Sequence, residues 1–580
     1  MRIVVAKTAG FCMGVRRAVD LALDAPGKEQ GPIRTFGPLI HNPQVLALFE
    51  ERGVNVLETI PAKGEGTILV RAHGVPPAVK QQLKQAGYVV IDATCPRVVK
   101  VQSIIKSHAA KGCAAIIVGD QDHPEVISLL GFAGDKGHVI GTMDELTALP
   151  AFDSAIVVAQ TTQNQSFYQA VKEWVARNHS HYKVFDTICD STEKRQAEVR
   201  RLAQEVEAVV VVGGKESGNT RRLAEIVAES GKPAYHVETE ADLDPDRLAH
   251  LRTVGVTAGA STPTWIIKRV VRALEEMPLR RGTGWYASLL RGQRLAMMTN
   301  LHVALGAAGL CFAATRLQNL DASFPALSVA FLYVLSMHIL NHLTGRAEDR
   351  YNDPERERFY SAHKWPLTAL AFAAGALGLV AAFQMGRLPF WVLLAMSLLG
   401  LSYNLRLLPD RLLPGLKWRR IRDLPGSKTL LIALAWGVVT AGLPALAAPD
   451  ASWLGGSMAI LWTTILAFVR TAFFDMLDIQ GDRIVGKETI PLLLGTKAAM
   501  TLLKVMLAVS MALLVTGAVT GVFALPAFGQ VLVPALLLGI VLNHERGGLL
   551  PGLRIDFAVE SLFVLSGGIA LIHAVFGQVL

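Results

Sequence analysis

The chain has 580 residues and a formal net charge of +9; 51% of its residues are hydrophobic and 18% are charged. This length predicts at least two domains, and the charged residues are too many for a chain that is embedded in a membrane throughout. Five cysteines in so long a chain exclude a disulfide-rich scaffold. Segment 1–12 indicates a strand that runs into a loop and lacks the long apolar core of a signal peptide, so we expect the first half to be cytoplasmic and reduced.

The first half alternates strands with helices up to about residue 277. Strands are predicted at Arg2–Ala6, Thr67–Arg71, Val89–Asp92, Ala114–Val118, Ala155–Ala159, Ala208–Val212 and Arg252–Thr257. Helical patterns follow several of them, such as Gly14–Leu23 and Asn219–Ser230. This alternation predicts parallel α/β units whose functional loops lie at the carboxyl ends of the strands.

Three of the predicted loops contain a cysteine: Cys12 in AGFCMGV, Cys95 in DATCPRV and Cys189 in DTICDST. Their similarity predicts a loose internal repeat, with three similar lobes that face one centre. Three thiolates indicate a metal centre, because soft sulfur ligands select zinc or an iron–sulfur cluster; the alternative is coincidence. A [4Fe–4S] cluster on three thiolates leaves one iron open to a substrate oxygen. Cys113 and Cys311 lie in apolar runs and are expected to serve packing.

Further polar side chains follow the predicted strands. Three are histidines: His41 in GPLIHNPQV, His73 in VRAHGVPP and His123 in GDQDHPEV. A single histidine is more often structural, but three after successive strands favour an anionic substrate, because imidazole N–H groups bind phosphate. Ser217 and Asn219 begin a predicted helix, and the N-terminus of a helix binds phosphate or is simply capped by such residues.

A dense and ordered series of motifs runs through residues 1–278: AGFCMGVRRAV, IHNPQV, RAHGVP, DATCPRVVKVQ, DHPEV, QTTQ, DTICDSTEKRQ, GGKESGNT and VTAGASTP. This series resembles that of the 4-hydroxy-3-methylbut-2-enyl diphosphate reductase family. The resemblance implies a three-lobed α/β fold around an oxygen-sensitive [4Fe–4S] cluster. It also implies reductive removal of a hydroxyl group from an allylic diphosphate, which yields isopentenyl and dimethylallyl diphosphates.

The resemblance further implies roles for the matched residues. Cys12, Cys95 and Cys189 would hold the cluster. The diphosphate would be bound by His41, His73, His123, Ser217, Gly218, Asn219 and Ser261. Thr161 would contact the hydroxyl region of the substrate, and Glu125 would head the proton path, which suits a poor leaving group that requires a Lewis acid, a proton and electrons. A ferredoxin- or flavodoxin-type protein would supply the electrons.

Two positions depart from the pattern of that family. Gly218 stands where the family usually has a second serine, and Gln102 replaces the usual histidine. The first departure removes one expected phosphate contact.

The second half changes character after a Gly- and Arg-rich stretch, 279–293, which is predicted to be a linker before a membrane domain over 294–580. Nine apolar spans are long enough to cross a bilayer: 295–315, 322–343, 365–385, 388–408, 428–448, 452–474, 500–522, 526–543 and 557–578. Loops after even-numbered spans are rich in Arg and Lys, for example Arg356, Lys428 and Arg470. The opposite loops hold only Arg316 and Arg387. This bias predicts a multi-pass protein of the inner (cytoplasmic) membrane with its first domain in the cytoplasm, and it explains the net charge without nucleic acid.

An acidic segment follows span six and reads RTAFFDMLDIQGDRIVGKETIPLLLG, with Asp475, Asp478 and Asp482 at the predicted membrane edge. Carboxylates four residues apart share a helix face and can hold Mg²⁺, which binds diphosphate. The segment resembles the second aspartate-rich motif of the UbiA family of membrane prenyltransferases, which has nine helices. The resemblance implies an all-α membrane domain and Mg²⁺-dependent prenyl transfer.

The first aspartate-rich motif of that family corresponds here to NHLTGRAEDRYNDPER. Asn341 and Asp349 match the motif and would hold Mg²⁺, and Asn352, Pro354 and Arg356 match its second part, whereas His342 and Gly345 stand where aspartates are usual. One Mg²⁺ site is therefore weakened.

These observations predict a bifunctional isoprenoid enzyme: a reductase that makes five-carbon diphosphates, joined to a domain that transfers a prenyl group from a polyprenyl diphosphate. For the first half, the alternative is a zinc-dependent hydrolase. For the second, it is a non-catalytic anchor or lipid-binding module; a transporter is disfavoured because the acidic residues lie at one face of the membrane. The sequence leaves the prenyl acceptor, the donor chain length, the electron donor and the oligomeric state open.

Overall fold

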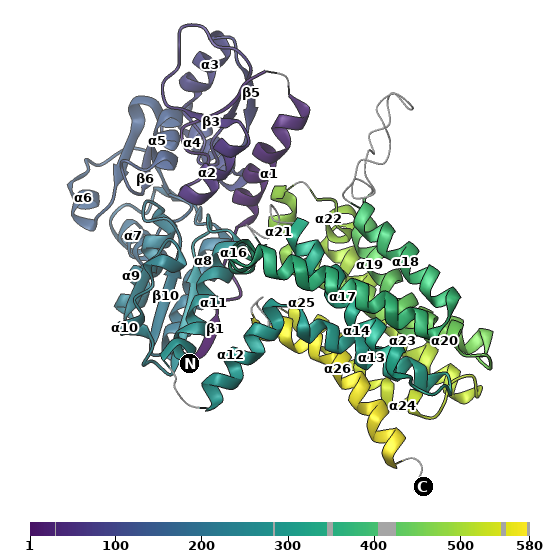
Figure 1. Cartoon of the computed structure of the whole chain (residues 1–580). Helices are drawn as coiled ribbons and strands as arrows, with labels where there is room; N and C mark the ends of the chain where they lie inside the picture. The colour runs from purple at the N-terminus through teal and green to yellow at the C-terminus, as the bar shows by residue number, and fades with distance from the viewer. Residues whose placement is uncertain are drawn as a thin grey trace. The chain divides into compact units, whose positions relative to one another are not determined.

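The computed structural model describes residues 1–29, 31–281, 285–344, 352–403, 425–485, 487–546 and 553–576. The chain divides into two compact units, Met1–Arg280 and Arg281–Leu580. The first alternates strands and helices, and the second is built of helices (Figure 1).

Three parallel sheets of four strands form the frame of the first unit. The first sheet has the order β1 (Arg2–Val5), β12 (Thr253–Ala258), β10 (Ala208–Val212), β11 (Ala234–Val237). The second has the order β3 (Val54–Leu57), β2 (Ile33–Phe36), β4 (Thr67–Val70), β5 (Val89–Asp92). The third has the order β7 (Gly137–Ile140), β6 (Ala114–Val118), β8 (Ala155–Ala159), β9 (Lys183–Val184).

Helices alternate with these strands and cover the sheets. They are α1 (Met13–Lys28), α2 (Pro43–Glu51), α3 (Pro77–Gln85), α4 (Pro96–Ala109), α5 (Pro124–Ala133), α6 (Met143–Ala148), α7 (Gln165–Asn178), α8 (Asp190–Glu205), α9 (Gly218–Glu229), α10 (Pro245–Leu248) and α11 (Thr264–Arg281). On the third sheet, α4 and α5 pack against one face and α7 against the other. Strands β6, β8 and β10 are consequently unbroken apolar runs with every residue buried, which is typical of parallel sheets covered on both faces.

Every predicted strand of the first unit is confirmed to within one residue at either end, and helices occupy the two segments given as examples. The prediction missed β2, β3, β7, β9 and β11. All of these except β2 lie at a sheet edge, where one side of the strand has no neighbour and an apolar run is not required. The inner strand β2 reads IRTF, and its polar Thr35 is nevertheless buried.

The second unit is a helical bundle. Its helices are α12 (Trp285–Met298), α13 (Leu301–Leu317), α14 (Phe324–Thr344), α16 (Pro354–Ala362), α17 (Lys364–Met385), α18 (Arg387–Ser402), α19 (Ser427–Gly437), α20 (Leu443–Ala447), α21 (Trp453–Val485), α22 (Ile490–Leu494), α23 (Thr496–Val519), α24 (Pro526–Gln530), α25 (Leu532–Glu545) and α26 (Leu553–Phe576). Helix α13 packs between α14 and α26, α14 packs against α17, and α21 packs against α19 and α23 (Figure 1).

Within the described residues, 7 helices are long and apolar enough to cross a bilayer, and the count rises to 8 if Arg291–Met298 and Leu301–Leu317, bent by 77°, form one span. The bend lies at Asn300, which has a φ of 61° and donates to the Tyr360 hydroxyl over 2.7 Å. Helix α18 is apolar but shorter. A multi-pass membrane domain is thus confirmed, while the number of nine crossings stays a prediction.

Several expectations about this region were wrong in detail. The acidic segment is no loop, because α21 continues to Val485 and carries all three aspartates. Arg470 is no loop charge either: it lies inside α21, 6% exposed, and its Nε donates to Glu560 of α26 over 2.8 Å. The segment predicted to be a linker, 279–293, is mostly helical and belongs to α11 and α12, and its role as a linker stays a prediction.

Candidate functional site

The three cysteines predicted to hold the cluster come one from each sheet of the first unit. Cys12 follows β1, Cys95 follows β5 and Cys189 follows β9. Each cysteine N–H donates to a carbonyl in a neighbouring loop of its own sheet: Ala260 at 3.1 Å, Ala72 at 2.9 Å and Thr161 at 2.9 Å, respectively. The same local geometry is therefore repeated three times, as the similarity of the three loops predicted.

Each of these cysteines also caps a helix. Cys12, Cys95 and Cys189 are the N-cap residues of α1, α4 and α8. Unpaired N–H groups and the positive end of the helix dipole favour negative charge at such positions, so the three helices stabilise thiolates at their ends. Burial raises the pKa of the Cys95 thiol, and the nearby thiols of Cys12 and Cys189 raise it further. The loops thus bring the three sulfur atoms close enough to interact.

One cavity of about 100 Å³, here called the cysteine–histidine cavity, collects the predicted site residues of the first unit. It is lined by Cys12, His41, His73, Cys95, His123, Glu125, Thr161, Cys189, Ser217, Gly218, Asn219 and Ser261. Helix α1 approaches it closely, since a Cβ at Gly14 would overlap the Cys95 Sγ. Cys113 lies elsewhere, partly exposed with its Sγ 3.1 Å from the Ser154 hydroxyl, so the expectation of a buried packing role fits only Cys311.

The histidines form a tight group at this cavity. Ring centroids of His41, His73 and His123 are 4.8 to 5.8 Å apart, and one ligand atom of each lies within 4.8 Å of the others. Burial lowers the pKa of all three, that of His123 to about 4. Arg71 lowers the pKa of all three further, and neighbouring histidines lower those of His73 and His123. The imidazoles are therefore neutral near pH 7 and can donate one N–H each to an anion.

Several nitrogen atoms around the cavity have no partner among the residues that the structure describes: His41 Nε2, His73 Nδ1, Asn219 Nδ2 and Arg222 Nη1. A buried donor without an acceptor costs about 1–3 kcal/mol. A group of them around one cavity indicates a site for a ligand rich in acceptors, such as a phosphate.

Glu125 is fully buried beside the histidines. Its carboxylate accepts the Thr161 N–H at 2.6 Å and the Thr161 hydroxyl at 2.9 Å. Burial raises the pKa of Glu125 to about 7, although both bonds from Thr161 lower it. A carboxyl group with this pKa can hold a proton and release it near neutral pH, as general acid catalysis requires.

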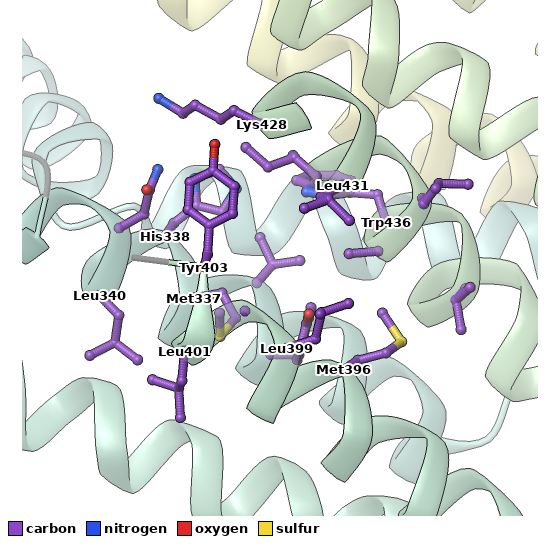
Figure 2. A pocket seen from close by; sticks show the side chains of 18 of the residues that line it. Met337, His338, Leu340, Met396, Leu399, Leu401, Tyr403, Lys428, Leu431 and Trp436 are labelled. Atoms are coloured by element: carbon purple, nitrogen blue, oxygen red, sulfur yellow. The ribbon is translucent and has the colours of Figure 1, made fainter. Parts of the chain in front are cut away.

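A second cavity, of about 310 Å³, lies between α14, α18 and α19 in the second unit. Figure 2 shows Lys428, the Tyr403 hydroxyl and His338 toward one end of it, with Leu399, Leu401 and Met396 toward the other. Asn341, one of the predicted Mg²⁺ ligands, also lines it. Most of its wall is apolar, so it suits a hydrocarbon chain with a polar head.

The three aspartates of the acidic segment, which are predicted Mg²⁺ ligands, share α21. Asp475 accepts the Thr429 hydroxyl at 2.8 Å, and Asp482 accepts Asn352 Nδ2 at 2.9 Å and Lys487 Nζ at 3.4 Å. Because 475, 478 and 482 are three and four residues apart, all three carboxylates lie on one helix face.

The Asn352–Asp482 bond joins the two acidic motifs. A side chain at position 481 would overlap Asn352, so only glycine fits at this point of α21. His342 lies 3.4 Å from an Arg356 nitrogen. Asp349 and Gly345 of the first motif lie outside the described residues.

Comparison with known proteins finds a similar family for each half of the chain. The profile of the LytB protein family matches residues 3–275, and that of the UbiA prenyltransferase family matches residues 302–546. A 4-hydroxy-3-methylbut-2-enyl diphosphate reductase from Pelobacter propionicus is 44% identical over 278 residues, which are 48% of this chain and 99% of the relative. The first half of the chain belongs to the 4-hydroxy-3-methylbut-2-enyl diphosphate reductase family. The second half is similar to the UbiA prenyltransferase family.

Solved structures resemble each half. A structure of (E)-4-hydroxy-3-methyl-but-2-enyl diphosphate reductase shares 40% identity and covers 48% of this chain and 100% of its own, with a TM-score of 0.38. A UbiA homolog from Archaeoglobus fulgidus bound to GPP and Mg²⁺ is 14% identical and covers 48% of this chain and 99% of its own, with a TM-score of 0.35.

The reductase domain also contains a buried arginine, Arg195, and a half-buried one, Arg71, that sequence reasoning missed. Arg195 donates to the carbonyls of Ala258 and Gly10 at 3.1 and 2.6 Å. Its guanidinium charge lies close enough to Cys12 and Cys189 to interact with their thiols. Arg71 bonds the Gly74 carbonyl at 3.3 Å beside the histidines. Both stand within motifs already singled out, DTICDSTEKRQ and RAHGVP, but an arginine in a sequence is more often exposed.

The two departures have different surroundings in the reductase domain. Gln102 is buried on α4 and donates to the Ser128 hydroxyl at 2.9 Å, away from the cavity lining, so it serves packing between α4 and α5. Gly218 lines the cavity itself.

Proposed function

We propose that the first half reduces (E)-4-hydroxy-3-methylbut-2-enyl diphosphate to isopentenyl and dimethylallyl diphosphates with a [4Fe–4S] cluster. The observation that carries this is the convergence of three helix-capping cysteines, three neutral histidines and a protonatable glutamate on one cavity, in a chain whose first half belongs to that family.

The residues fit such a cluster. Cys12, Cys95 and Cys189 are the thiols that would hold it, and helix N-termini behind each favour its negative charge. When bound, the cluster would supply electrons and a Lewis-acidic iron for the substrate hydroxyl. The C–O bond breaks, the hydroxyl leaves as water, and two electrons and two protons are consumed overall.

A single zinc ion suits these thiols less well. Thiolates on one zinc stand at most about 4.6 Å apart, because the Zn–S bond is about 2.3 Å. The histidine trio is the one such group compact enough for one ion among the residues that the structure describes, and the cysteines do not form another. The cysteines therefore suit a multi-iron cluster better than one zinc ion, and the metal content of the purified protein separates the reductase from a zinc hydrolase.

The protein's own groups perform the remaining steps. His41, His73, His123, Ser217, Asn219 and Ser261 bind and orient the diphosphate, with Gly218 leaving room beside them. Glu125 holds a proton next to Thr161, which contacts the region of the substrate hydroxyl. Burial of these groups excludes water and strengthens their hydrogen bonds.

The test is an anaerobic assay of the whole protein in membranes, with the hydroxylated allylic diphosphate and a strong chemical reductant. Isopentenyl and dimethylallyl diphosphates should form, and the purified protein should be brown and sensitive to air. A colourless, zinc-containing protein that hydrolyses its substrate would overturn the proposal.

Glu125→Gln is expected to lower reductase turnover by about a hundredfold or more, the scale of general acid catalysis, while diphosphate binding survives. Because the pKa of Glu125 is raised to about 7, its acid form is lost as the pH rises through that value, and turnover of the unaltered protein should fall with it. Initial rates between about pH 6 and 9 measure this loss, which the Gln variant should not show.

Thr161→Val is expected to shift the pH dependence of reductase turnover. It removes a hydroxyl bond that favours the Glu125 carboxylate, so the fall in turnover should move to higher pH. Near-normal turnover of Glu125→Gln would assign the acid role to another group.

Binding of diphosphate is expected to take up protons. The pKa of His73 is lowered most by burial, and a bound anion reverses part of that shift, so affinity should fall as the pH rises. Calorimetry in buffers of different ionisation enthalpy, with EDTA present, measures the uptake. His73→Gln should reduce the number of protons taken up on binding, and the uptake that remains comes from protonation of the diphosphate itself. Equal proton uptake by the variant and the unaltered protein would contradict a role for His73.

For the second half, we infer prenyl transfer from a polyprenyl diphosphate. Asp475, Asp478 and Asp482, with Asn341 and Asp349 of the first motif, would hold Mg²⁺ on the diphosphate, and the apolar cavity of Figure 2 would hold the hydrocarbon chain. The Asn352–Asp482 bond supports this proposal, because it joins a residue of the first acidic motif to a residue of the second.

The distribution of basic residues in the sequence supports nine crossings of the inner membrane, with the reductase domain in the cytoplasm. A ferredoxin- or flavodoxin-type donor would reach it there. A non-catalytic anchor is the competing function for the second half.

A further inference from the structure

Arg222 is a buried cation on α9 that the mechanism above does not use. The residue is 7% exposed. Nε donates to Gln163 Oε1 at 3.0 Å, and Nη2 donates to the Asp120 carboxylate oxygens at 2.8 and 3.0 Å. The third nitrogen, Nη1, is buried and has no hydrogen-bond partner in the part of the chain that the structure describes.

Gly218 stands between this nitrogen and the cysteine–histidine cavity. Gly218 lines the cavity, and Arg222 lies one helical turn further along α9. A Cβ at position 218 would lie 3.3 Å from Arg222 Nη1, 3.6 Å from His123 Cδ2 and 3.7 Å from Asp120 Oδ2. The missing side chain therefore leaves a gap that is bounded by a guanidinium N–H on one side and a phosphate-binding histidine on the other.

We infer that Arg222 is a diphosphate-binding residue of this protein and that its Nη1 donates to the ligand through the gap at Gly218. Gln163 and Asp120 hold the other two nitrogens, so the guanidinium is already oriented before the ligand arrives. An oxyanion in the gap satisfies the unpaired N–H and receives a charge-assisted bond. Arg222 thereby replaces the contact that a serine at 218 would make. The inference rests on the proposed diphosphate site.

The competing reading is a structural tie. Asp120 follows β6 of the third sheet and Arg222 follows β10 of the first, so the ion pair also joins two lobes. The two readings predict opposite changes in ligand affinity for Asp120→Asn. A structural tie predicts weaker ligand binding, because the lobes lose a contact. A diphosphate-binding Arg222 predicts equal or tighter binding, because a negative charge beside the anion is removed while the amide can still accept from Nη2.

The experiment is calorimetric titration of the cluster-loaded full-length protein with inorganic diphosphate, without oxygen and with EDTA to silence Mg²⁺-dependent binding by the UbiA domain. Arg222→Gln should weaken binding by about ten- to a hundredfold, the range for a bond to a charged group. Arg221→Gln is the matched control: it removes the same charge from an exposed neighbour on the same helix, which acts on the site only through its charge near His41, and should weaken binding much less than Arg222→Gln does.

Two variants with small side chains at 218 leave Arg222 and its ion pair intact. Gly218→Ala covers Nη1 with a methyl group and should weaken binding by about tenfold, whereas Gly218→Ser accepts from Nη1, donates to the ligand and should bind at least as tightly as the unaltered protein. Equal affinities of the Gly, Ala and Ser proteins, or an Asp120→Asn defect as large as that of Arg222→Gln, would overturn the inference. If the unaltered protein binds no diphosphate, the proposed site itself fails.

Discussion

Replacing Cys95 by Ser is expected to abolish the cluster and, with it, reductase turnover. An oxygen ligand is harder than sulfur and binds iron–sulfur clusters poorly, and Cys95 shares its cavity with the other two thiols from separate sheets. Loss of one ligand out of three leaves too few to retain the cluster. The same result is expected for Cys12→Ser and Cys189→Ser. Visible absorbance and iron content of the anaerobically purified protein measure it.

The chain contains its own controls for this experiment. Cys113 lies beside Ser154, and Cys311 is buried in the second unit, so Cys113→Ser and Cys311→Ser should keep the absorbance. A fully loaded cluster in the Cys95→Ser protein would refute the ligand assignment. Thermal unfolding separates loss of the cluster from loss of the fold.

Asp478→Ala and Asp482→Ala are each expected to eliminate prenyl transfer and to leave the reductase unchanged. As the diphosphate leaves the prenyl chain, negative charge builds on its bridging oxygen, and Mg²⁺ held by carboxylates neutralises it. With His342 and Gly345 in the first motif, this protein has fewer anionic ligands to share a second ion. It should therefore depend fully on α21 and show a weaker Mg²⁺ dependence than relatives with both motifs.

The measurement is prenyl transfer in membranes against aromatic and lipid acceptors, titrated with Mg²⁺. Glu545→Gln is a suitable control, because it also removes a carboxylate, from the exposed Lys504–Glu545 pair at the end of α25. His342→Asp with Gly345→Asp should tighten Mg²⁺ binding. If no acceptor is prenylated and a prenyl diphosphate binds equally well without Mg²⁺, the second half is an anchor.

The reductase site was largely readable from the sequence, because its residues occur in short motifs directly after strands. A run such as AVVVV predicts a covered parallel strand, and the carboxyl end of such a strand is where function gathers. Cys12, Cys95 and Cys189 could be singled out in this way, and so could the histidines. Their roles remain predictions that the experiments above test.

The sequence did not reveal which charged residues are buried. Nothing in the letters distinguishes Arg222 from its exposed neighbour Arg221, and only the packing of α9 against the loop after β6 pairs it with Asp120. The pKa of Glu125 is another such property, because it arises from complete burial beside Thr161. Arg470 looked like a loop charge until its pairing with Glu560, which lies on another helix, placed it inside the bundle.

The sequence by itself determined the two-part organisation, the parallel α/β order, the apolar spans and the motifs that carry the chemistry, because these depend on periodicity and on neighbours along the chain. Only the tertiary structure decided which loops of three separate sheets meet, how α21 extends through its acidic motif, and that Asn352 reaches Asp482. Those facts depend on contacts between residues far apart in sequence. Such contacts set burial, charge and the direction of each donor, and no local pattern records them.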